Sequence, residues 1–242
     1  MVRLGDLYAR ATTGPSYPPD AGDLTDIRLF GLTFPLRASV AVLVTTAIVV
    51  VEQLRWLVPA GAGPVAGVHP VQLARFALFL LVPLAVIVLG FRDSPARYAL
   101  RLGDWRWGAG LLVAGLAVMT PIILGLAQLP EFRGYYGAAT EAIGPRLLNN
   151  LVELIPGEFL LRGFLMFALW RRIGPLALVV SLVPFVLTHI GKPAIELWST
   201  FLGGAIFAWL DWRTGSILWS ALGHVCVLTL MLVAVGGASL GG

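Results

Sequence analysis

Five ionisable side chains stand inside long apolar stretches of this 242-residue chain: Glu153, Glu158, Arg162, His189 and His224. A charged side chain at the centre of a bilayer costs about 2.5–3.5 kcal/mol on insertion scales, so such residues are candidates for function. Glu158 and Arg162 are four residues apart with the glutamate first, the favourable order for an ion pair on one helix face. The pair can be structural, locking its helix to its neighbours, or part of an active site.

Glu158 and the two histidines are expected at a similar depth. At 1.5 Å per residue, Glu158 lies roughly 20 Å from the membrane face that Arg171 marks. The same count places His189 roughly 21 Å and His224 roughly 16 Å from that face. Three predicted helices thus bring a carboxylate and two imidazoles to one level. The third histidine, His69, precedes Pro70 in a loop and is expected to be incidental.

Two kinds of chemistry fit this set. A carboxylate and a neutral imidazole can together deprotonate a water for attack on a peptide carbonyl, and a second imidazole can donate to the oxyanion. The same Glu158, His189 and His224 can instead hold a divalent metal, because two imidazoles and one carboxylate are a common ligand set. Cys226 is not expected to join them, since residues two apart on a helix point in different directions.

The elements that must position these groups are membrane helices. Hydrophobic residues make up 58% of the chain and charged residues 12%, with a mean hydropathy of +0.86. A soluble domain uses about 25% charged residues and could not hide this much apolar surface. We therefore expect an all-α protein, a multi-pass transmembrane helical bundle. The arginines flank apolar runs, which indicates membrane topology and not nucleic-acid binding.

About seven spans are predicted, at about 20 apolar residues for each crossing. Residues 1–30 form a polar segment that is expected to be mobile, and residues 31–242 form the transmembrane domain. The predicted spans are about Leu36–Val58, Val71–Phe91, Trp107–Leu129, Leu147–Trp170, Pro175–Ile190, Leu197–Leu210 and Ser216–Val235.

The cations predict the orientation. Eleven of the 17 fall on the side of the N-terminus and five on the other, and Arg162 lies within a span. Under the positive-inside rule the N-terminus is cytoplasmic, and the Glu–His set is nearer the outer face. We expect a multi-pass protein of a cell membrane, of the bacterial inner-membrane kind. The eleven cations are Arg3, Arg10, Arg28, Arg37, Arg92, Arg97, Arg101, Arg106, Arg171, Arg172 and Arg213.

Three motifs between about residues 146 and 235 resemble those of one family. The sequence from Gly157 to Phe164, Gly-Glu-Phe-Leu-Leu-Arg-Gly-Phe, resembles a Glu-Glu-x-x-x-Arg motif, and Phe185-Val-Leu-Thr-His189 resembles Phe-x-x-x-His. A small-residue helix, an Arg-Thr-Gly-Ser turn and His224 follow in the same order. The family is the CPBP group of CAAX proteases and bacteriocin-processing enzymes, also called the Abi family.

The resemblance implies a helical bundle with a polar cavity, and intramembrane endopeptidase activity on protein or peptide substrates in or at the membrane. It implies that Glu158, Arg162, His189 and His224 are the site residues, and that glutamate and histidine activate water without a metal or another cofactor. The metal-bound form of Glu158, His189 and His224 is the minority interpretation.

The chain departs from the family pattern at two positions. Gly157 replaces the first glutamate, the one thought to activate water, and Leu228 replaces an Asn or Asp four residues after His224. Glu158 can take over as the base. Glu153 can substitute instead, because it lies one turn before Gly157 on the same face, unless Pro156 breaks the helix there.

Three functions remain open on the sequence. The first is an endopeptidase in which Glu158 and His189 activate water, His224 supports the oxyanion and Arg162 positions Glu158. The second is a catalytically silent relative that serves as a membrane scaffold or immunity protein. The third is a small proton-coupled transporter, which the lack of an inverted repeat disfavours.

Overall fold

The computed structural model describes residues 5, 9, 12–137, 141–236 and 238–239. Arg3 and Arg10, two of the cations used for orientation, lie outside the described residues, as does part of the predicted mobile segment. The fold is an all-α bundle, as the sequence predicts. Two very short strand pairs accompany it: β1 (Asp26–Leu29) with β2 (Leu32–Pro35), antiparallel, and β3 (Glu141–Ala142) with β4 (Ala238–Ser239), parallel.

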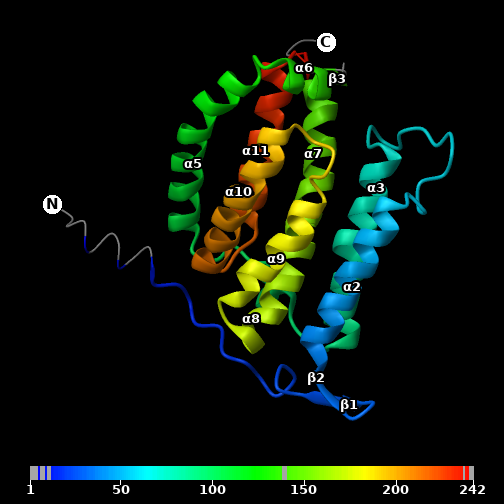
Figure 1. Ribbon diagram of the computed structural model, residues 1–242, viewed down its shortest axis with the longest axis vertical. Helices are drawn as coiled ribbons and strands as arrows, with labels where there is room; N and C mark the ends of the chain where they lie inside the picture. Colours follow the sequence, from blue (N-terminus) through cyan, green and yellow to red (C-terminus); the bar gives the residue numbers. More distant parts are fainter. Residues whose placement is uncertain (1–4, 6–8, 10–11, 138–140, 237, 240–242) are drawn as a thin grey trace.

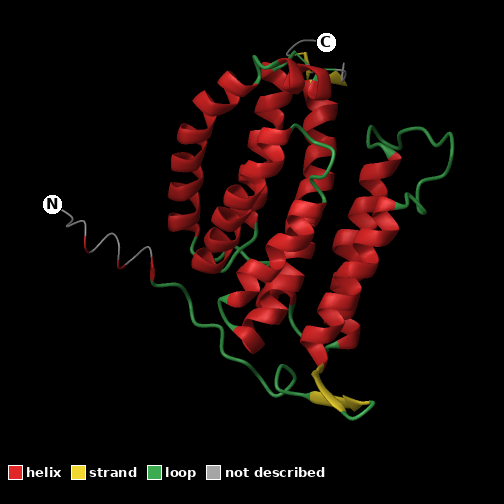
Figure 2. Ribbon diagram, in the orientation of Figure 1, coloured by secondary structure: helices red, strands yellow, loops and turns green. Residues whose placement is uncertain are grey.

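Helices that run lengthwise through the bundle form most of the described chain (Figures 1 and 2). The α2–α3 pair forms one side and α5 the other, with α7 to α11 between them (Figure 1). The elements are α2 (Leu36–Gln53), α3 (Pro70–Phe76), η1 (Ala77–Leu81), α4 (Val82–Ala85), η2 (Val86–Gly90), η3 (Pro95–Tyr98), α5 (Trp105–Leu126), α6 (Pro130–Tyr136), α7 (Ile143–Glu158), η4 (Phe159–Met166), α8 (Phe167–Ile173), α9 (Leu176–Leu187), α10 (Ala194–Thr214) and α11 (Leu218–Ala234).

Three helical stretches are long and apolar enough to cross a membrane: Leu36–Gln53, Pro70–Gly90 and Trp105–Leu126. Two further apolar helices, α9 and α11, are shorter. α9 and α11 have 12 and 17 residues and fall short of the length of a crossing, while α7 and α10 carry charged residues, among them Glu153, Glu158 and Asp211. The count of about seven spans stays a prediction.

The helix that carries Glu158 is continuous from Ile143 to Ile173. The expectation that Pro156 can break it is wrong, since α7 continues through Pro156 to Glu158. A proline removes one backbone donor, and membrane helices tolerate this when neighbouring turns adjust. Here η4, a π-helical segment, begins directly after Glu158. π-Helical turns are rare and are often found at functional sites.

The main apolar core surrounds η4, whose eight residues are all buried. Its neighbours include residues of α2, η1, α8 and α9. Gly163 allows the closest approach, because a Cβ there would lie 2.9 Å from the Tyr98 carbonyl oxygen and 2.7 Å from the Phe159 ring. This packing holds the Glu158–Arg162 segment rigidly in the middle of the bundle.

The described part of the N-terminal segment, which the sequence predicts to be mobile, contacts the bundle. The Tyr17 ring packs edge-on against Phe167 with centroids 5.0 Å apart. Asp23, which is buried, accepts hydrogen bonds from Arg37 (3.0 Å) and Arg97 (2.5 Å). These contacts join the segment to α2 and η3, because acidic residues in the polar stretch meet arginines at the helix ends.

Acid is expected to release this segment. Burial alone would raise the pKa of Asp20, but the Asp23 amide and the guanidinium groups of Arg37 and Arg97 outweigh it and lower the pKa below 3.8. A lowered folded-state pKa contributes stability above the unfolded value, and that stability is lost as the pH falls below about 4. Pepsin cleavage before residue 30 should rise over that range. Asp20→Asn should be cleaved at higher pH than the wild type; identical profiles would contradict the prediction.

Candidate active site

Three helices bring the predicted site residues together. Glu158 ends α7 and Arg162 lies in η4. His189 lies two residues beyond the end of α9, and His224 lies near the middle of α11. The contacts of α7 and η4 with α9 and α11 place these groups side by side in the bundle. The His189 and His224 rings stack with centroids 6.2 Å apart and an interplanar angle of 16°. The structure therefore unites Glu158, Arg162, His189 and His224, as their depths predict.

Both oxygens of the buried Glu158 carboxylate are engaged. Its Oε1 lies 2.7 Å from His224 Nδ1, and its Oε2 accepts a hydrogen bond from Arg162 Nη1 within an ion pair. Because a carboxylate only accepts, the Nδ1 of His224 carries a proton toward Glu158. Glu158 thus orients the His224 imidazole.

His189 is oriented by a backbone carbonyl. Its Nδ1 donates to the Phe185 oxygen at 2.8 Å, one turn earlier on α9. In the neutral imidazole the lone pair is therefore on Nε2. The Phe185 ring packs against both imidazoles, at 4.7 Å from His189 and 6.0 Å from His224. The two histidines thus differ in their hydrogen-bond partners, which are a carboxylate for His224 and a backbone carbonyl for His189.

Arg162 lies behind Glu158 and is buried. Its guanidinium stacks on the Phe185 ring at 4.1 Å and donates to the Gly204 carbonyl at 3.4 Å. An arginine is well suited to this place, because it remains charged and its planar group can stack on a ring while it pairs with a carboxylate.

Removal of Arg162 is expected to destabilise the fold. Arg162→Met leaves Glu158 as a buried charge without its ion-pair partner, which costs about 3–5 kcal/mol. Adding Glu158→Gln should recover part of the loss, since the two residues interact directly. Unfolding in mixed detergent micelles measures both variants. Strictly additive effects would show that the pair contributes nothing.

A cavity of about 190 Å³ adjoins the site. Glu158, His189 and His224 all form part of its wall, so the site is accessible to a small polar molecule. Residues from α2, α3, η1, α6, α7, η4, α9, the loop after α9 and α11 surround it. They are Glu52, Arg75, Phe79, Tyr135, Glu153, Leu154, Gly157, Glu158, Leu161, Phe185, Thr188, His189, Lys192, His224 and Leu228.

Both departures from the family pattern lie on the wall of this cavity. A Cβ built on Gly157 would meet nothing nearer than the Phe79 ring, at 4.0 Å. Space for a side chain therefore exists at Gly157. Leu228 lies one turn beyond His224 on α11 and presents an apolar surface to the cavity.

Glu153, the predicted substitute base, lines the same cavity but is held by other partners. Its carboxylate forms an ion pair with Arg75 and accepts a hydrogen bond from Gln72 at 2.9 Å. Arg75 also donates to Glu52, from Nη2 at 2.7 Å. The Glu52–Arg75–Glu153 cluster forms a charged part of the cavity wall. Both oxygens of the Glu153 carboxylate are already engaged, one by Arg75 and one by Gln72, which disfavours Glu153 as the base.

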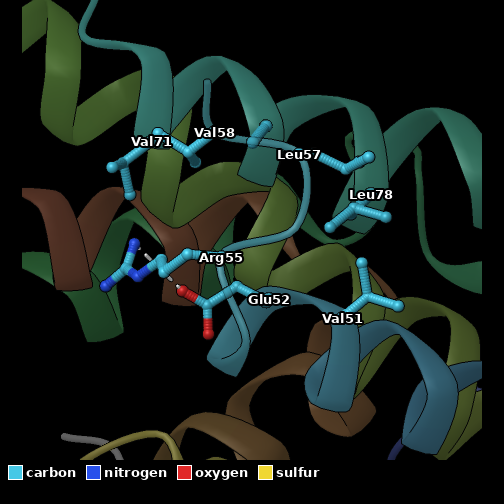
Figure 3. Close-up of a pocket in the computed structure, with 8 residues that line it drawn as sticks. Val51, Glu52, Arg55, Leu57, Val58, Val71 and Leu78 are labelled. Carbon is cyan, nitrogen blue, oxygen red and sulfur yellow. Dashed lines mark ion pairs between the residues drawn. The ribbon is translucent and has the colours of Figure 1, made fainter. Parts of the chain in front are cut away.

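A separate small pocket lies at the end of α2 (Figure 3). Arg55 extends over Glu52 there at 3.5 Å, among apolar side chains that include Val51 and Leu78. Its volume of about 10 Å³ suffices for about one water molecule. This pocket therefore supports the Glu52 side chain and does not hold a substrate.

The sequence interpretation missed three charged residues near the site. Glu52 and Arg75 lie within the first two predicted spans, so the cost of intramembrane charge was a signal for both. Asp211 is fully buried on α10 and accepts a hydrogen bond from Ser220 at 2.9 Å. Asp211 falls one residue beyond the predicted sixth span, whereas α10 continues to Thr214.

A metal ion shared by Glu158, His189 and His224 would need their donor atoms to point at one centre. Within the described ranges, no three His, Cys, Asp or Glu side chains are arranged to hold one. Glu158 Oε1 and His224 Nδ1 point at each other, 2.7 Å apart, and do not point together at a third position where a metal ion could sit. This donor set fits a hydrogen-bonded carboxylate–imidazole pair and does not fit a shared metal ion.

Comparison with known proteins agrees with the motifs. Residues 139–230 match the family described as Type II CAAX prenyl endopeptidase Rce1-like. No curated protein and no solved structure matches the chain. The matched range contains all the predicted site residues and covers the predicted core from residue 146 through residue 230. The chain therefore carries, at residues 139–230, an Rce1-like domain of the membrane-embedded CPBP/CAAX protease family.

Proposed function

We propose that this protein is an intramembrane endopeptidase that cleaves membrane-associated or exported proteins or peptides with a water activated by histidine. The observation that carries the proposal is the Glu158–His224 hydrogen bond, which lies on a cavity wall together with His189. One imidazole is hydrogen-bonded to a carboxylate and the other to a backbone carbonyl, so the two are oriented differently for the roles of oxyanion donor and base.

The two histidines divide the work. His189, neutral, takes a proton from water on Nε2 as the water oxygen attacks the peptide carbonyl carbon. His224, oriented by its hydrogen bond to Glu158, donates to the oxyanion that forms. When the oxyanion re-forms the carbonyl and the C–N bond breaks, the proton on His189 passes to the leaving amine. The products are an amine and a carboxylic acid, which releases its remaining proton to solvent and becomes the carboxylate. Glu158 and Arg162 are positioning residues here, because both carboxylate oxygens are already bonded.

We propose further that the chain crosses a bacterial inner membrane several times with a cytoplasmic N-terminus. The support is the excess of arginines at the helix ends beside the N-terminal segment. Under this orientation the cavity opens nearer the outer face, which suits exported or membrane-tethered substrates and not nucleic acid. Reporter fusions in the loop after His189 test it, and a cytoplasmic reporter signal there would contradict it.

The activity is tested with purified protein in vesicles of phosphatidylcholine and phosphatidylglycerol. Two fluorogenic probes are supplied in the same vesicles: a peptide with an S-farnesylated cysteine followed by three residues, and an unprenylated single-span peptide. Cleavage is compared in the wild type, His189→Ala, His224→Ala and the control His69→Ala. We expect both site variants to lose activity and His69→Ala to retain it.

Two other outcomes are informative. Equal cleavage by all four proteins would refute the histidine mechanism. If a chelator abolishes the activity and zinc restores it, the site holds a catalytic metal ion, because chelators remove metal ions that protein side chains bind.

A catalytically silent membrane scaffold is the second candidate. Gly157 and Leu228 favour it, since both cavity positions lack the polar groups of the family pattern. A wild type that binds the probes without cleaving them, and binds equally well as His189→Ala, would support this alternative.

A further inference from the structure

The β1–β2 hairpin exposes an apolar tip. Phe30, at its turn, is fully exposed at 102%, and Leu29 and Leu32 on either side are 50% and 62% exposed. Nothing within the described part of the chain covers these side chains. Water is a poor environment for three adjacent large apolar side chains, so their exposure indicates another contact.

The turn chemistry is unusual in the same place. Leu29 pairs with Leu32, so Phe30 and Gly31 form a two-residue loop, with φ of +53° and +79°. Such loops prefer Asn-Gly or Asp-Gly, because positive φ is strained for a residue with a bulky side chain. Phenylalanine is thus unfavourable here both for the backbone and for its exposure. Strained residues persist where a function requires them.

The position of the hairpin suits a membrane surface. β2 runs directly into α2, a helix long and apolar enough to cross a membrane. The hairpin leaves the end of α2 to the side and does not continue its axis (Figure 1). Arg172, at the end of α8, donates to Asp26 at 2.5 Å and ties the base of the hairpin to the bundle. The tip is therefore held near the depth at which the helices end.

The charges of the hairpin match lipid headgroups. Arg28 is exposed and forms no ion pair with a described residue. It stands two residues before the apolar tip, and its cross-strand partner is Thr33. An arginine beside a bulky apolar tip is typical of segments that lie in the headgroup and acyl boundary.

We propose that the β1–β2 hairpin is an interfacial membrane anchor, which inserts Leu29, Phe30 and Leu32 into the lipid of the membrane that holds the bundle. An isolated two-stranded hairpin is marginal in water. Contact with lipid supplies the apolar burial that its own four residue pairs lack. The anchor would fix the N-terminal segment and the start of α2 at the membrane surface.

The experiment uses the single native cysteine. In a Cys226→Ser background, nitroxide labels are placed at Phe30→Cys, Leu32→Cys or Thr33→Cys in vesicles of phosphatidylcholine and phosphatidylglycerol. Collision rates with oxygen, which dissolves in lipid, and with a water-soluble nickel complex report immersion. We expect labels at 30 and 32 to favour oxygen and the label at 33, which points to the opposite face of the strand, to favour nickel.

Nickel-dominated collisions at all three positions would overturn the proposal. Dipolar broadening at position 30 that disappears on dilution with unlabelled protein would instead identify a second copy as the occupant, and would overturn it too. Phe30→Asn provides a check on folding, because Asn-Gly is the preferred turn. In this variant a label at 32 should keep its ordered spectrum and lose its preference for oxygen; retained preference would contradict the anchor.

Discussion

Glu158→Gln is expected to lower kcat/KM by about 1000-fold. The substitution keeps the size of the side chain and removes the carboxylate that orients His224 through a contact of 2.7 Å. Loss of an oxyanion donor costs about 10²–10³, and loss of the carboxylate behind a catalytic histidine about 10⁴. Initial rates with the tethered fluorogenic peptides measure the effect.

Two further glutamine variants make this result specific. Glu131 is exposed on α6, away from the cavity, and Glu131→Gln should leave the rate unchanged. Glu153→Gln tests the other carboxylate on the cavity wall. A loss of about 1000-fold in Glu153→Gln, together with full activity in Glu158→Gln, would indicate Glu153 as the base. It would refute the role assigned to Glu158.

Gly157→Glu is expected to raise the cleavage rate by about 100-fold. The cavity has room at this position, since a Cβ there meets nothing nearer than 4.0 Å. A carboxylate at Gly157 would provide a general base on the wall that also carries His189, and general bases contribute about 10²–10⁴. Glutamate also favours the helix over glycine by up to about 1 kcal/mol, so the fold should tolerate the change.

Gly157→Gln is the matched control, because it fills the same space without a carboxylate. A gain limited to Gly157→Glu would show that the native site lacks a base of full strength. Equal rates for the two variants would contradict the prediction and leave His189 as the sole base. If the wild type is silent and Gly157→Glu cleaves, the native protein is the scaffold and the fold retains a latent active site.

The cost of charge in a membrane made most of the site predictable from sequence. Glu158, Arg162, His189 and His224 stand out in apolar runs, and their distances from the helix ends place them at one level. In the structure Glu158, His189 and His224 line one cavity and Arg162 pairs with Glu158, while their roles as site residues stay a prediction. The same argument applies to Glu52 and Arg75. Both lie within the first two predicted spans but were left out of the set of five candidate residues.

Three-dimensional contacts decided the partners of each group. Spacing along the chain shows that Glu153 and Gly157 are one turn apart, but only the fold shows Arg75 arriving from α3 to pair with Glu153. Likewise, no local sequence pattern predicts that Glu158 forms a hydrogen bond with His224, which is 66 residues away in the sequence. Such pairings depend on helix packing, which apolar periodicity constrains only loosely.

The sequence by itself determined the class of protein, the depth of the polar groups and the two missing family residues, because composition and helical rise are local properties. The tertiary structure alone decided which partners each carboxylate has, where the cavity lies and that Phe30 has no cover within the described chain. These features follow from contacts between segments distant in sequence, and their free energies depend on burial and distance, which no single segment specifies.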